Sequence, residues 1–312
     1  MRAFIFPGQG SQSVGMGAAL AEASRTARDT FAEVDEALGQ NLTKLMREGP
    51  EEDLRLTENA QPAIMAHSLA VFRALTKDGG VDLNKAAQFV AGHSLGEYSA
   101  LAAAGTFDLA TTAKLLKLRG RAMQAAVPVG QGAMAALLGA DLEMAQRIAN
   151  AAAEGEICTV ANDNDPGQVV ISGDKGAIDR AVAIAKDMGA KRAVILPVSA
   201  PFHCPLMQPA ADAMAEALAA VTLKAPTVPL YANVTAAPVS DPEAIMNQLV
   251  EQVTAMVRWR ESIANMAAAG VEEFVELGGK VLGPMVKRTA PDAQVSSLIA
   301  IDDIEAMAKE LH

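Results

Sequence analysis

Short apolar runs alternate along this chain with longer stretches that are amphipathic or rich in alanine. The short runs have the length of buried strands, and the longer stretches have the length of helices. The expected strands outside the middle of the chain are 3–6, 86–91 and 228–233, and the expected helices are 18–38, 63–75, 97–104, 109–125 and 205–219. Strands that alternate with helices form a parallel sheet covered by helices, so the pattern predicts an α/β fold.

The pattern changes after Gly132. The order becomes strand, helix, two strands, helix and strand, at 133–138, 142–154, 158–162, 169–173, 178–188 and 193–196. This β-α-β-β-α-β order is typical of a ferredoxin-like domain. We therefore expect a small ferredoxin-like α+β domain at 129–197, inserted into a large domain formed by 1–128 and 198–312.

Two local features follow from turn and helix signals. Asp163 and Asp165 belong to a segment rich in Asn, Asp, Pro and Gly, which predicts a tight turn between the middle strands of the small domain. Pro62 precedes the apolar stretch 63–75, and we expect it in the first turn of that helix.

The composition is that of a globular protein, since 51% of the 312 residues are hydrophobic and 20% are charged. A net charge of −11 argues against a nucleic-acid binder, because phosphate backbones attract basic surfaces. No apolar run reaches the roughly 20 residues of a membrane span. Cys158 and Cys204 provide neither a disulfide framework nor a metal-binding spacing. We therefore expect a soluble cytoplasmic protein without a bound metal.

The segment Gly92-His93-Ser94-Leu95-Gly96 follows the apolar run 86–91 and precedes the expected helix 97–104. It has the G-x-S-x-G pattern in the strand–turn–helix context of the nucleophile elbow of α/β-hydrolase-like domains. The glycines permit a tight turn that exposes the Ser94 hydroxyl, and the helix N-terminus presents free N–H groups. Ser94 is therefore the candidate nucleophile, and the Leu95 N–H is a candidate donor to an oxyanion.

A serine nucleophile needs a neighbouring base, most often a histidine, and the chain has four histidines. His312 is the last residue and is expected to be frayed. His93 adjoins the serine, where neighbouring side chains diverge, and His67 lies among apolar residues of a helix. His203 lies in the connection between the two expected domains, where a cleft would form, and is the candidate base. No acidic residue stands out as its partner, so we expect a Ser–His dyad oriented by a backbone carbonyl or an amide side chain.

The glycine-rich turn after the first strand has two interpretations. Gly8 and Gly10 suggest a dinucleotide or phosphate loop, but the third glycine of G-x-G-x-x-G is absent and no Lys-Ser/Thr follows. The alternative is that Gln9 supplies a second oxyanion donor, through its side-chain amide or its backbone N–H. The sequence favours this alternative.

Several motifs in order along nearly the whole chain carry a family resemblance. They are Phe6-Pro7-Gly8-Gln9-Gly10-Ser11-Gln12, Thr57-x-x-x-Gln61-Pro62-Ala63, Gly92 to Ala100, Arg119 to Gln124, Ala161 to Gly173 and Pro201 to Met207. In these segments the chain resembles the malonyl-CoA:acyl-carrier-protein transacylases of type II fatty-acid synthesis, and also the acyltransferase domains of polyketide synthases.

The resemblance implies a role for each catalytic candidate. Ser94 would carry the acyl group as an ester, and His203 would act as base and then as acid. Gln9 and the Leu95 N–H would form the oxyanion hole. Gln252 would orient His203 through its backbone carbonyl.

The resemblance also implies how the acyl group is selected. Arg119 would bind the malonyl carboxylate, since a guanidinium binds a carboxylate through two charge-assisted hydrogen bonds. An acetyl group would leave a buried arginine unpaired and so be disfavoured. Phe202 would leave little room for a branching methyl group, and Asn162 would contact the acyl substrate from the insert.

The resemblance implies malonyl-CoA and the phosphopantetheine form of acyl-carrier protein as partners, with ping-pong transfer and no cofactor. Because carrier proteins of this kind are acidic, we expect docking on a local basic patch. Its candidates are Lys114, Lys117, Arg121, Lys186, Lys191 and Arg192. The alternatives are a discrete polyketide-pathway acyltransferase, a serine thioesterase or other hydrolase, and a catalytically silent scaffold.

Overall fold

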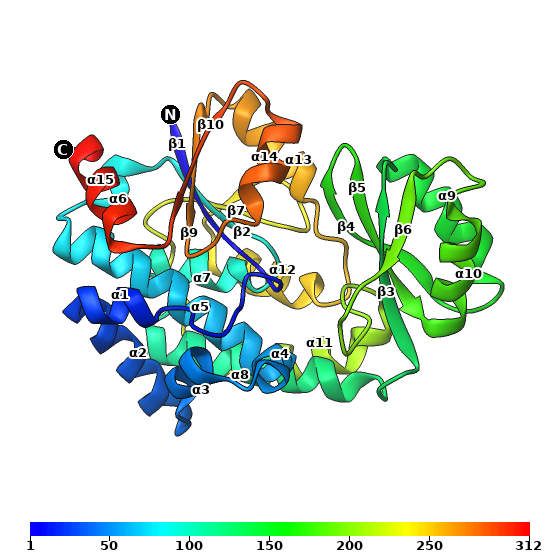
Figure 1. Ribbon diagram of the computed structural model, residues 1–312, viewed down its shortest axis with the longest axis horizontal. Coiled ribbons are helices and arrows are strands. Elements are labelled where there is room, and N and C mark those ends of the chain that lie inside the picture. Colours follow the sequence, from blue (N-terminus) through cyan, green and yellow to red (C-terminus); the bar gives the residue numbers. More distant parts are fainter.

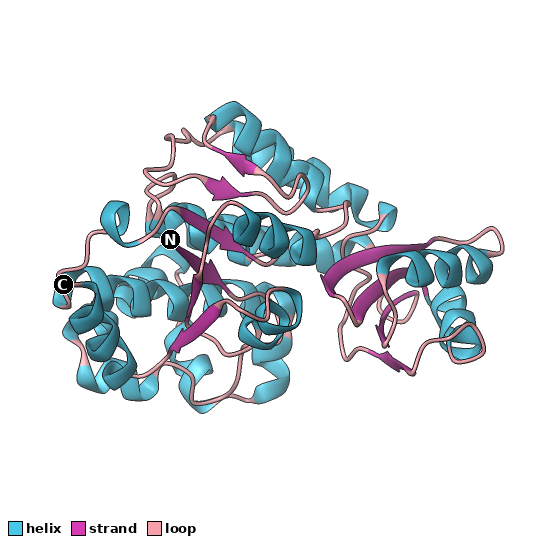
Figure 2. Cartoon of the chain, turned by 90° about the horizontal axis from the view of Figure 1, so that it is seen from above, coloured by secondary structure: helices cyan, strands magenta, loops and turns pink.

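The computed structural model describes residues 1–312 and contains two separate β-sheets (Figures 1 and 2). The larger sheet has six strands in the order β10-β9-β1-β2-β7-β8. They are β1 (Arg2–Phe6), β2 (Phe89–Gly92), β7 (Leu230–Tyr231), β8 (Pro238–Val239), β9 (Glu273–Leu277) and β10 (Gln294–Leu298). Neighbouring strands are parallel except for β7 and β8. The predicted parallel α/β sheet is confirmed.

Helices cover both faces of this sheet, as alternate residues of β1 show. Phe4 and Phe6 belong to the main hydrophobic core, whereas Ala3 and Ile5 belong to a separate core with residues of α13 (Trp259–Ala268) and α14 (Leu282–Thr289). The strand period of two directs successive side chains to opposite faces. The other helices packed around this sheet are α1 (Ala18–Ala23), α2 (Arg25–Leu38), α3 (Leu42–Glu48), α4 (Glu51–Arg55), α5 (Thr57–Arg73), α6 (Leu83–Ala86), α7 (Gly96–Ala103), α8 (Leu109–Ala126), α11 (Gln208–Ala219), α12 (Pro242–Gln252) and α15 (Ile301–Leu311).

The second sheet is antiparallel and lies to one side of the larger one (Figure 1). Its strands, in the order β4-β5-β3-β6, are β3 (Gly132–Leu138), β4 (Cys158–Asp165), β5 (Gln168–Asp174) and β6 (Arg192–Ile195). Helices α9 (Leu142–Ala153) and α10 (Lys175–Ala185) share a small core with Ala135 and Leu137 of β3. The β-α-β-β-α-β order and this strand arrangement are those of the expected ferredoxin-like unit. The exact boundaries, 128/129 and 197/198, stay predictions.

The expected turn at Asp163 and Asp165 is wrong, because both residues lie inside β4 and are buried. The turn is confined to Pro166 and Gly167. Two arginines from the larger part of the chain stabilise the buried carboxylates. Arg260 of α13 donates to both oxygens of Asp163 at 3.0 and 3.1 Å, and Arg288 of α14 donates to Asp165 at 2.8 Å. The strand therefore extends because ion pairs across the two parts compensate its buried charges.

Two predicted helices differ in their limits. The stretch 18–38 forms two helices, because Ser24 has an extended backbone and its hydroxyl accepts a hydrogen bond from the Ala27 N–H at 3.1 Å. A serine at this position competes with the helix and caps the next one. The helix expected at 63–75 begins earlier, at Thr57, so Pro62 lies inside it and costs one main-chain hydrogen bond.

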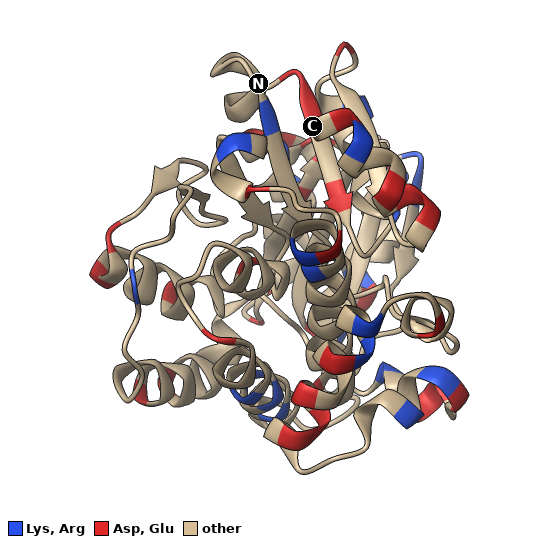
Figure 3. Ribbon diagram, turned by 90° about the vertical axis from the view of Figure 1, so that its left-hand side faces the viewer, with Lys and Arg blue, Asp and Glu red and all other residues tan.

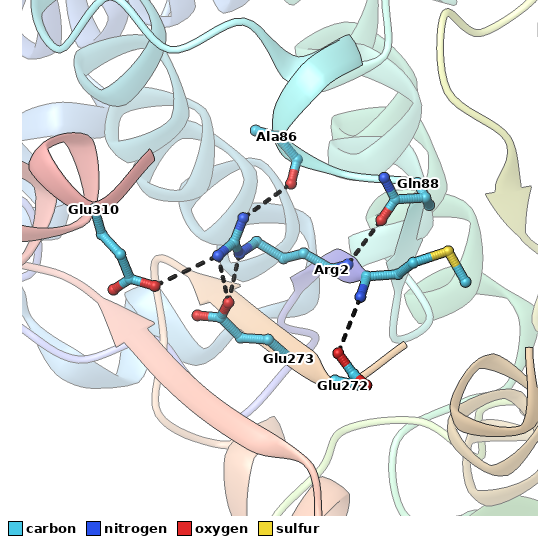
Figure 4. Close-up of polar contacts among 7 residues, drawn as sticks. Arg2, Ala86, Gln88, Glu272, Glu273 and Glu310 are labelled. Atoms are coloured by element: carbon cyan, nitrogen blue, oxygen red, sulfur yellow. Dashed lines mark hydrogen bonds and ion pairs between the residues drawn. The ribbon is translucent and has the colours of Figure 1, made fainter. Parts of the chain in front are cut away.

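The two chain ends are joined at the start of β1 (Figure 4). The Arg2 guanidinium donates to Glu273 of β9 at 2.6 Å and to Glu310 of α15 at 3.4 Å. It also donates to the Ala86 carbonyl at 3.3 Å, while the Gln88 side chain accepts from the Arg2 N–H at 2.8 Å. Among these contacts, the one with Glu310 links the last helix to the first strand. No helix of the structure is both long enough and apolar enough to cross a membrane.

Candidate active site

The turn between β2 and α7 is the predicted elbow. Ser94 has a left-handed backbone with φ of 55°. Gly92 and Gly96, two positions before and after it, leave space for this tight turn. A Cβ on Gly92 would lie 1.9 Å from the Gly96 carbonyl carbon, and a Cβ on Gly96 would lie 2.3 Å from the Phe6 carbonyl oxygen. Neither position therefore has room for a side chain. The packing explains why this strained turn requires both glycines.

His203 faces Ser94 from the connection after β6. The Ser94 hydroxyl lies 2.8 Å from His203 Nε2, and His203 Nδ1 lies 2.8 Å from the Gln252 carbonyl oxygen. Since a carbonyl can only accept, Nδ1 carries the proton and Nε2 is left to accept from the serine. Burial, and next the charge of Arg119, lower the pKa of His203 to about 3, so the imidazole stays neutral at physiological pH. The structure thus contains a Ser–His pair oriented by a backbone carbonyl.

Arg119 of α8 lies beside this pair and is only 1% exposed. Its guanidinium donates to Gln61 Oε1 at 2.8 Å, to Gln252 Oε1 at 2.7 Å and to the Ser94 hydroxyl at 3.2 Å. No carboxylate forms a salt bridge with it, and its Nε–H has no partner. A buried guanidinium without a salt-bridge partner is costly, and chemically it can bind an anion next to the serine.

These groups line one cavity of about 360 Å³. Ser94, Arg119 and His203 line it together with the other predicted residues Gln9, Leu95, Asn162 and Phe202. Asn162 belongs to β4, and Met134 of β3 is a further lining residue, so both sheets contribute to the walls. All the predicted residues except Gln252 therefore lie on one cavity, and Gln252 lies directly behind it.

The side chains of Glu97, Asn233 and Gln252 form hydrogen bonds that support the elbow. Asn233 Oδ1 accepts from the Ser94 N–H at 2.8 Å, and its Nδ2 donates to the Gly92 carbonyl at 2.7 Å. Gln252 Nε2 donates to the Ser94 carbonyl at 3.0 Å and to Glu97 Oε2. The side chain of Gln252 thus adds contacts to those that the resemblance implied for its backbone.

A second chain of hydrogen bonds runs from Arg119 toward Gln9. Gln61 Nε2 donates to Thr57 Oγ1 at 3.0 Å, and Thr57 Oγ1 lies 3.1 Å from Gln9 Oε1. An arginine can only donate, so it fixes the direction of each following bond. In this direction the Gln9 amide nitrogen is left free beside the cavity.

The remaining histidines lie away from the Ser94 hydroxyl. His67 is buried on α5, and burial lowers its pKa to about 4. His93 Nε2 lies 2.7 Å from Asn164 Oδ1 of β4, so it connects the elbow to the small sheet. The prediction of a frayed His312 is wrong in one respect, since its Nε2 is hydrogen-bonded to the Gly79 carbonyl oxygen at 2.7 Å.

The expected basic patch is only partly available. Lys117 is buried, donates to Asn59 at 2.8 Å and lies 3.2 Å from Glu58, so its place in a docking surface is wrong. Arg121 is exposed but is paired with Glu58 at 2.9 Å. Figure 3 shows basic and acidic residues interspersed on the side that it presents. Lys114, Lys186, Lys191 and Arg192 are exposed and keep the prediction open.

The elbow, the Ser–His pair and the unpaired arginine identify the class of the protein. The chain belongs to the acyl transferase domain family, whose match covers residues 3–295. Within this family, its relatives carry a more specific name. The malonyl CoA-acyl carrier protein transacylase of Escherichia coli K12 is 47% identical over 310 residues, which is 99% of this chain and 98% of that protein.

Solved structures agree with this. The acyl-carrier-protein S-malonyltransferase of Bartonella henselae is 52% identical with a TM-score of 0.97, and the match covers 99% of both chains. A malonyl-transacylase in complex with its type II PKS acyl-carrier protein is 41% identical with a TM-score of 0.95, again over 99% of both chains. The resemblance and the fold expected from the motifs are confirmed.

The roles of five residues were not predicted from the sequence: Thr57, Gln61, Glu97, Asn233 and Asn164. Thr57 and Gln61 are separated by four residues, which places them on one helix face. Asn233 follows β7, and the carboxyl ends of parallel strands meet at one edge of a sheet. These two signals were available, whereas the contacts of Glu97 and Asn164 depend on tertiary packing.

Proposed function

We propose that this protein transfers a malonyl group from malonyl-CoA to the phosphopantetheine thiol of an acyl-carrier protein, through a malonyl ester on Ser94. The observation that carries the proposal is Arg119, whose buried guanidinium lies 3.2 Å from the Ser94 hydroxyl and forms no salt bridge. An acyl group that ends in a carboxylate would supply the missing charge. Its bidentate pairing with Arg119 would place the thioester carbon beside Ser94.

In the first half-reaction Ser94 Oγ attacks the thioester carbon while His203 Nε2 takes the hydroxyl proton. The resulting oxyanion is stabilised by the Leu95 N–H and by Gln9. The intermediate then collapses, the carbon–sulfur bond breaks, and the sulfur of CoA receives the proton from His203. The Gln252 carbonyl keeps His203 in the required tautomer throughout.

In the second half-reaction the phosphopantetheine thiol gives its proton to His203 and attacks the ester. Ser94 leaves with that proton, and the malonyl thioester is formed again on the carrier. One thioester replaces another at similar free energy, and because no atom changes its oxidation state the transfer needs no electron carrier. Phe202 narrows the cavity against a branched acyl group, and Asn162 contacts the acyl chain from the small domain.

The choice of acceptor is supported by the relatives, whose names specify acyl carrier protein as their partner. Transfer in fatty-acid synthesis is the main proposal. The type II PKS carrier of one neighbour makes a discrete polyketide-pathway role the second candidate. A cytoplasmic location remains a prediction, as do the domain limits 1–128, 129–197 and 198–312.

Intact-protein mass spectrometry tests the proposal. After mixing with malonyl-CoA the protein should gain one malonyl group, and S94A should gain none. Acetyl-CoA should label the protein weakly or not at all. Adding phosphopantetheinylated carrier protein should discharge the ester quickly, whereas loss to water alone at the same rate would favour a hydrolase. Absence of any labelled Ser94 would favour a silent scaffold.

A further inference from the structure

Glu97 is a buried carboxylate that the proposed mechanism does not use. It lies in the first turn of α7, three residues after Ser94, and is 1% exposed. Each of its oxygens accepts one hydrogen bond: Oε1 from the Asn233 backbone N–H at 2.8 Å and Oε2 from Gln252 Nε2. No arginine or lysine forms a salt bridge with it. Its negative charge is therefore stabilised only by these two hydrogen-bond donors and by the nearby positive charge of Arg119.

Gln252 depends on this carboxylate for its orientation. Its Nε2 faces three acceptors, which are Glu97, the Ser94 carbonyl and Asn233 Oδ1. Its Oε1 accepts from Arg119 at 2.7 Å. Rotating the amide by half a turn would set donor against donor at Arg119 and acceptor against acceptor at Glu97. Only one orientation therefore satisfies every neighbour.

We propose that Glu97 is a positioning residue for the proposed malonyl transfer: its carboxylate fixes the Gln252 amide so that Arg119 and the elbow are held together. The inference rests on the proposed function, because the group that it positions is the one proposed to bind the malonyl carboxylate. Glu97 does not touch substrate; it acts through Gln252.

The requirement is for a carboxylate and not merely for a side chain of this shape. A glutamine at position 97 has one oxygen to offer, while both Asn233 and Gln252 present N–H donors. One of the two donors would then face an NH₂ group, and the Gln252 amide could not satisfy all of its neighbours. A protonated Glu97 has the same defect, since its hydroxyl replaces one acceptor. E97Q therefore imitates the acid form of the protein.

The groups around Glu97 differ in how they respond to pH. Burial raises the pKa of Glu97 to about 7, against the hydrogen bonds from Asn233 and Gln252 and the charge of Arg119. Burial raises the pKa of Tyr98 to about 12 and lowers that of His203 to about 3, and it also lowers the pKa of His93. Among the groups facing this site, Glu97 is the one expected to change charge near neutral pH.

The test measures how fast the full-length protein is malonylated, by rapid quenching and mass spectrometry, between about pH 5.5 and 8.5. Wild type should reach a plateau above about pH 7 and lose about tenfold in rate per pH unit below it. E97Q should lack this acid limb and lie about ten- to a hundredfold below the wild-type plateau, as for a lost hydrogen bond to a charged group.

Glu276 supplies the matched control. It is also a fully buried glutamate held by main-chain N–H groups, those of Val281, Leu282 and Gly283, but it lies outside the cavity. E276Q should keep both the plateau and the acid limb. If E276Q behaves like E97Q, the effect is general to buried glutamates and the inference is overturned.

Two further outcomes separate the inference from the proposed function. If wild type forms the ester on Ser94 but E97Q keeps the same loss of rate at low pH, the inference alone is overturned. If wild type never forms the ester, both the inference and the proposed function are overturned. If E97Q does not fold, ¹³C NMR of the Glu97 carboxyl in wild type replaces it. Its titration must coincide with the acid limb, and a titration separated from the limb by more than about one pH unit overturns the inference.

Discussion

Replacing Arg119 by alanine is expected to reverse the preference of the protein between malonyl-CoA and acetyl-CoA. In the structure three donor contacts of the guanidinium are occupied by Gln61, Gln252 and Ser94. Nη2 uses both of its hydrogens on Gln252 and Ser94, so a substrate carboxylate would take the Nη2 hydrogen that now faces Ser94 together with the free hydrogen of Nη1. R119A removes both and leaves the malonyl carboxylate buried without a partner.

The magnitude follows from those two bonds. A hydrogen bond to a charged group contributes about 1.5–3 kcal/mol, so two contribute about 3–6 kcal/mol. Since about 1.4 kcal/mol corresponds to a factor of ten, kcat/KM for malonyl-CoA should fall by about 10² to 10⁴. Acetyl-CoA has no carboxylate to lose, and removal of an unpaired buried charge should leave its rate unchanged or raise it.

The assay measures acylation of Ser94 by each thioester separately, with R121A as the control. Arg121 is on the same helix and has the same charge, but it is exposed and paired with Glu58. Its loss should leave both acylation rates unchanged. An R119A protein that folds and keeps its preference for malonyl-CoA would refute the assignment of Arg119 to the carboxylate.

Three other outcomes are expected. T57V removes the hydroxyl that donates to the Gln9 side chain and should slow acylation about tenfold. T112V removes a buried hydroxyl that bonds only within its own helix and should not slow acylation. Equal effects of the two variants would contradict a role for the chain of hydrogen bonds from Arg119 to Gln9. F202A enlarges the cavity and should raise the rate with methylmalonyl-CoA relative to malonyl-CoA by about tenfold or more, so an unchanged ratio would remove Phe202 from substrate selection. His67 should contribute about 3 kcal/mol of stability that is present above pH 6.5 and is lost as pH falls toward about 4, because the unfolded chain takes up the proton first. Urea unfolding should show a weaker pH dependence for H67L, and identical slopes would contradict this explanation.

Local patterns in the sequence identified Ser94, Leu95 and His203, whereas the roles of Phe202 and Asn162 came from the family resemblance. Ser94 and Leu95 belong to a strand–turn–helix motif, and His203 followed from the connection in which it lies. Arg119 is different: on periodicity alone it is one of several basic residues of α8, and only the family resemblance distinguished it from Lys117. Burial of both residues shows why local pattern could not separate them, since it does not reveal that one faces a cavity and the other a glutamate.

The predictions about the fold that were wrong have identifiable physical causes. Asp163 and Asp165 read as turn residues because two carboxylates inside a strand are costly, and their compensation comes from arginines about a hundred residues further on. Ser24 divides a helix through a single side-chain hydrogen bond, which composition averaged over a long stretch conceals. The first interaction lies far outside the window in which a sequence pattern is read, whereas the second lies inside it but depends on one position.

The ion pairs of β4 also bear on how this fold can be recombined. Arg260 and Arg288 belong to the chain after the insert, yet they neutralise carboxylates inside it. A small domain exchanged between relatives as a block from 129 to 197 would carry the acids without their arginines. Chimeras should therefore keep their stability only when donor and recipient share both pairs, or when positions 260 and 288 are exchanged together with the block.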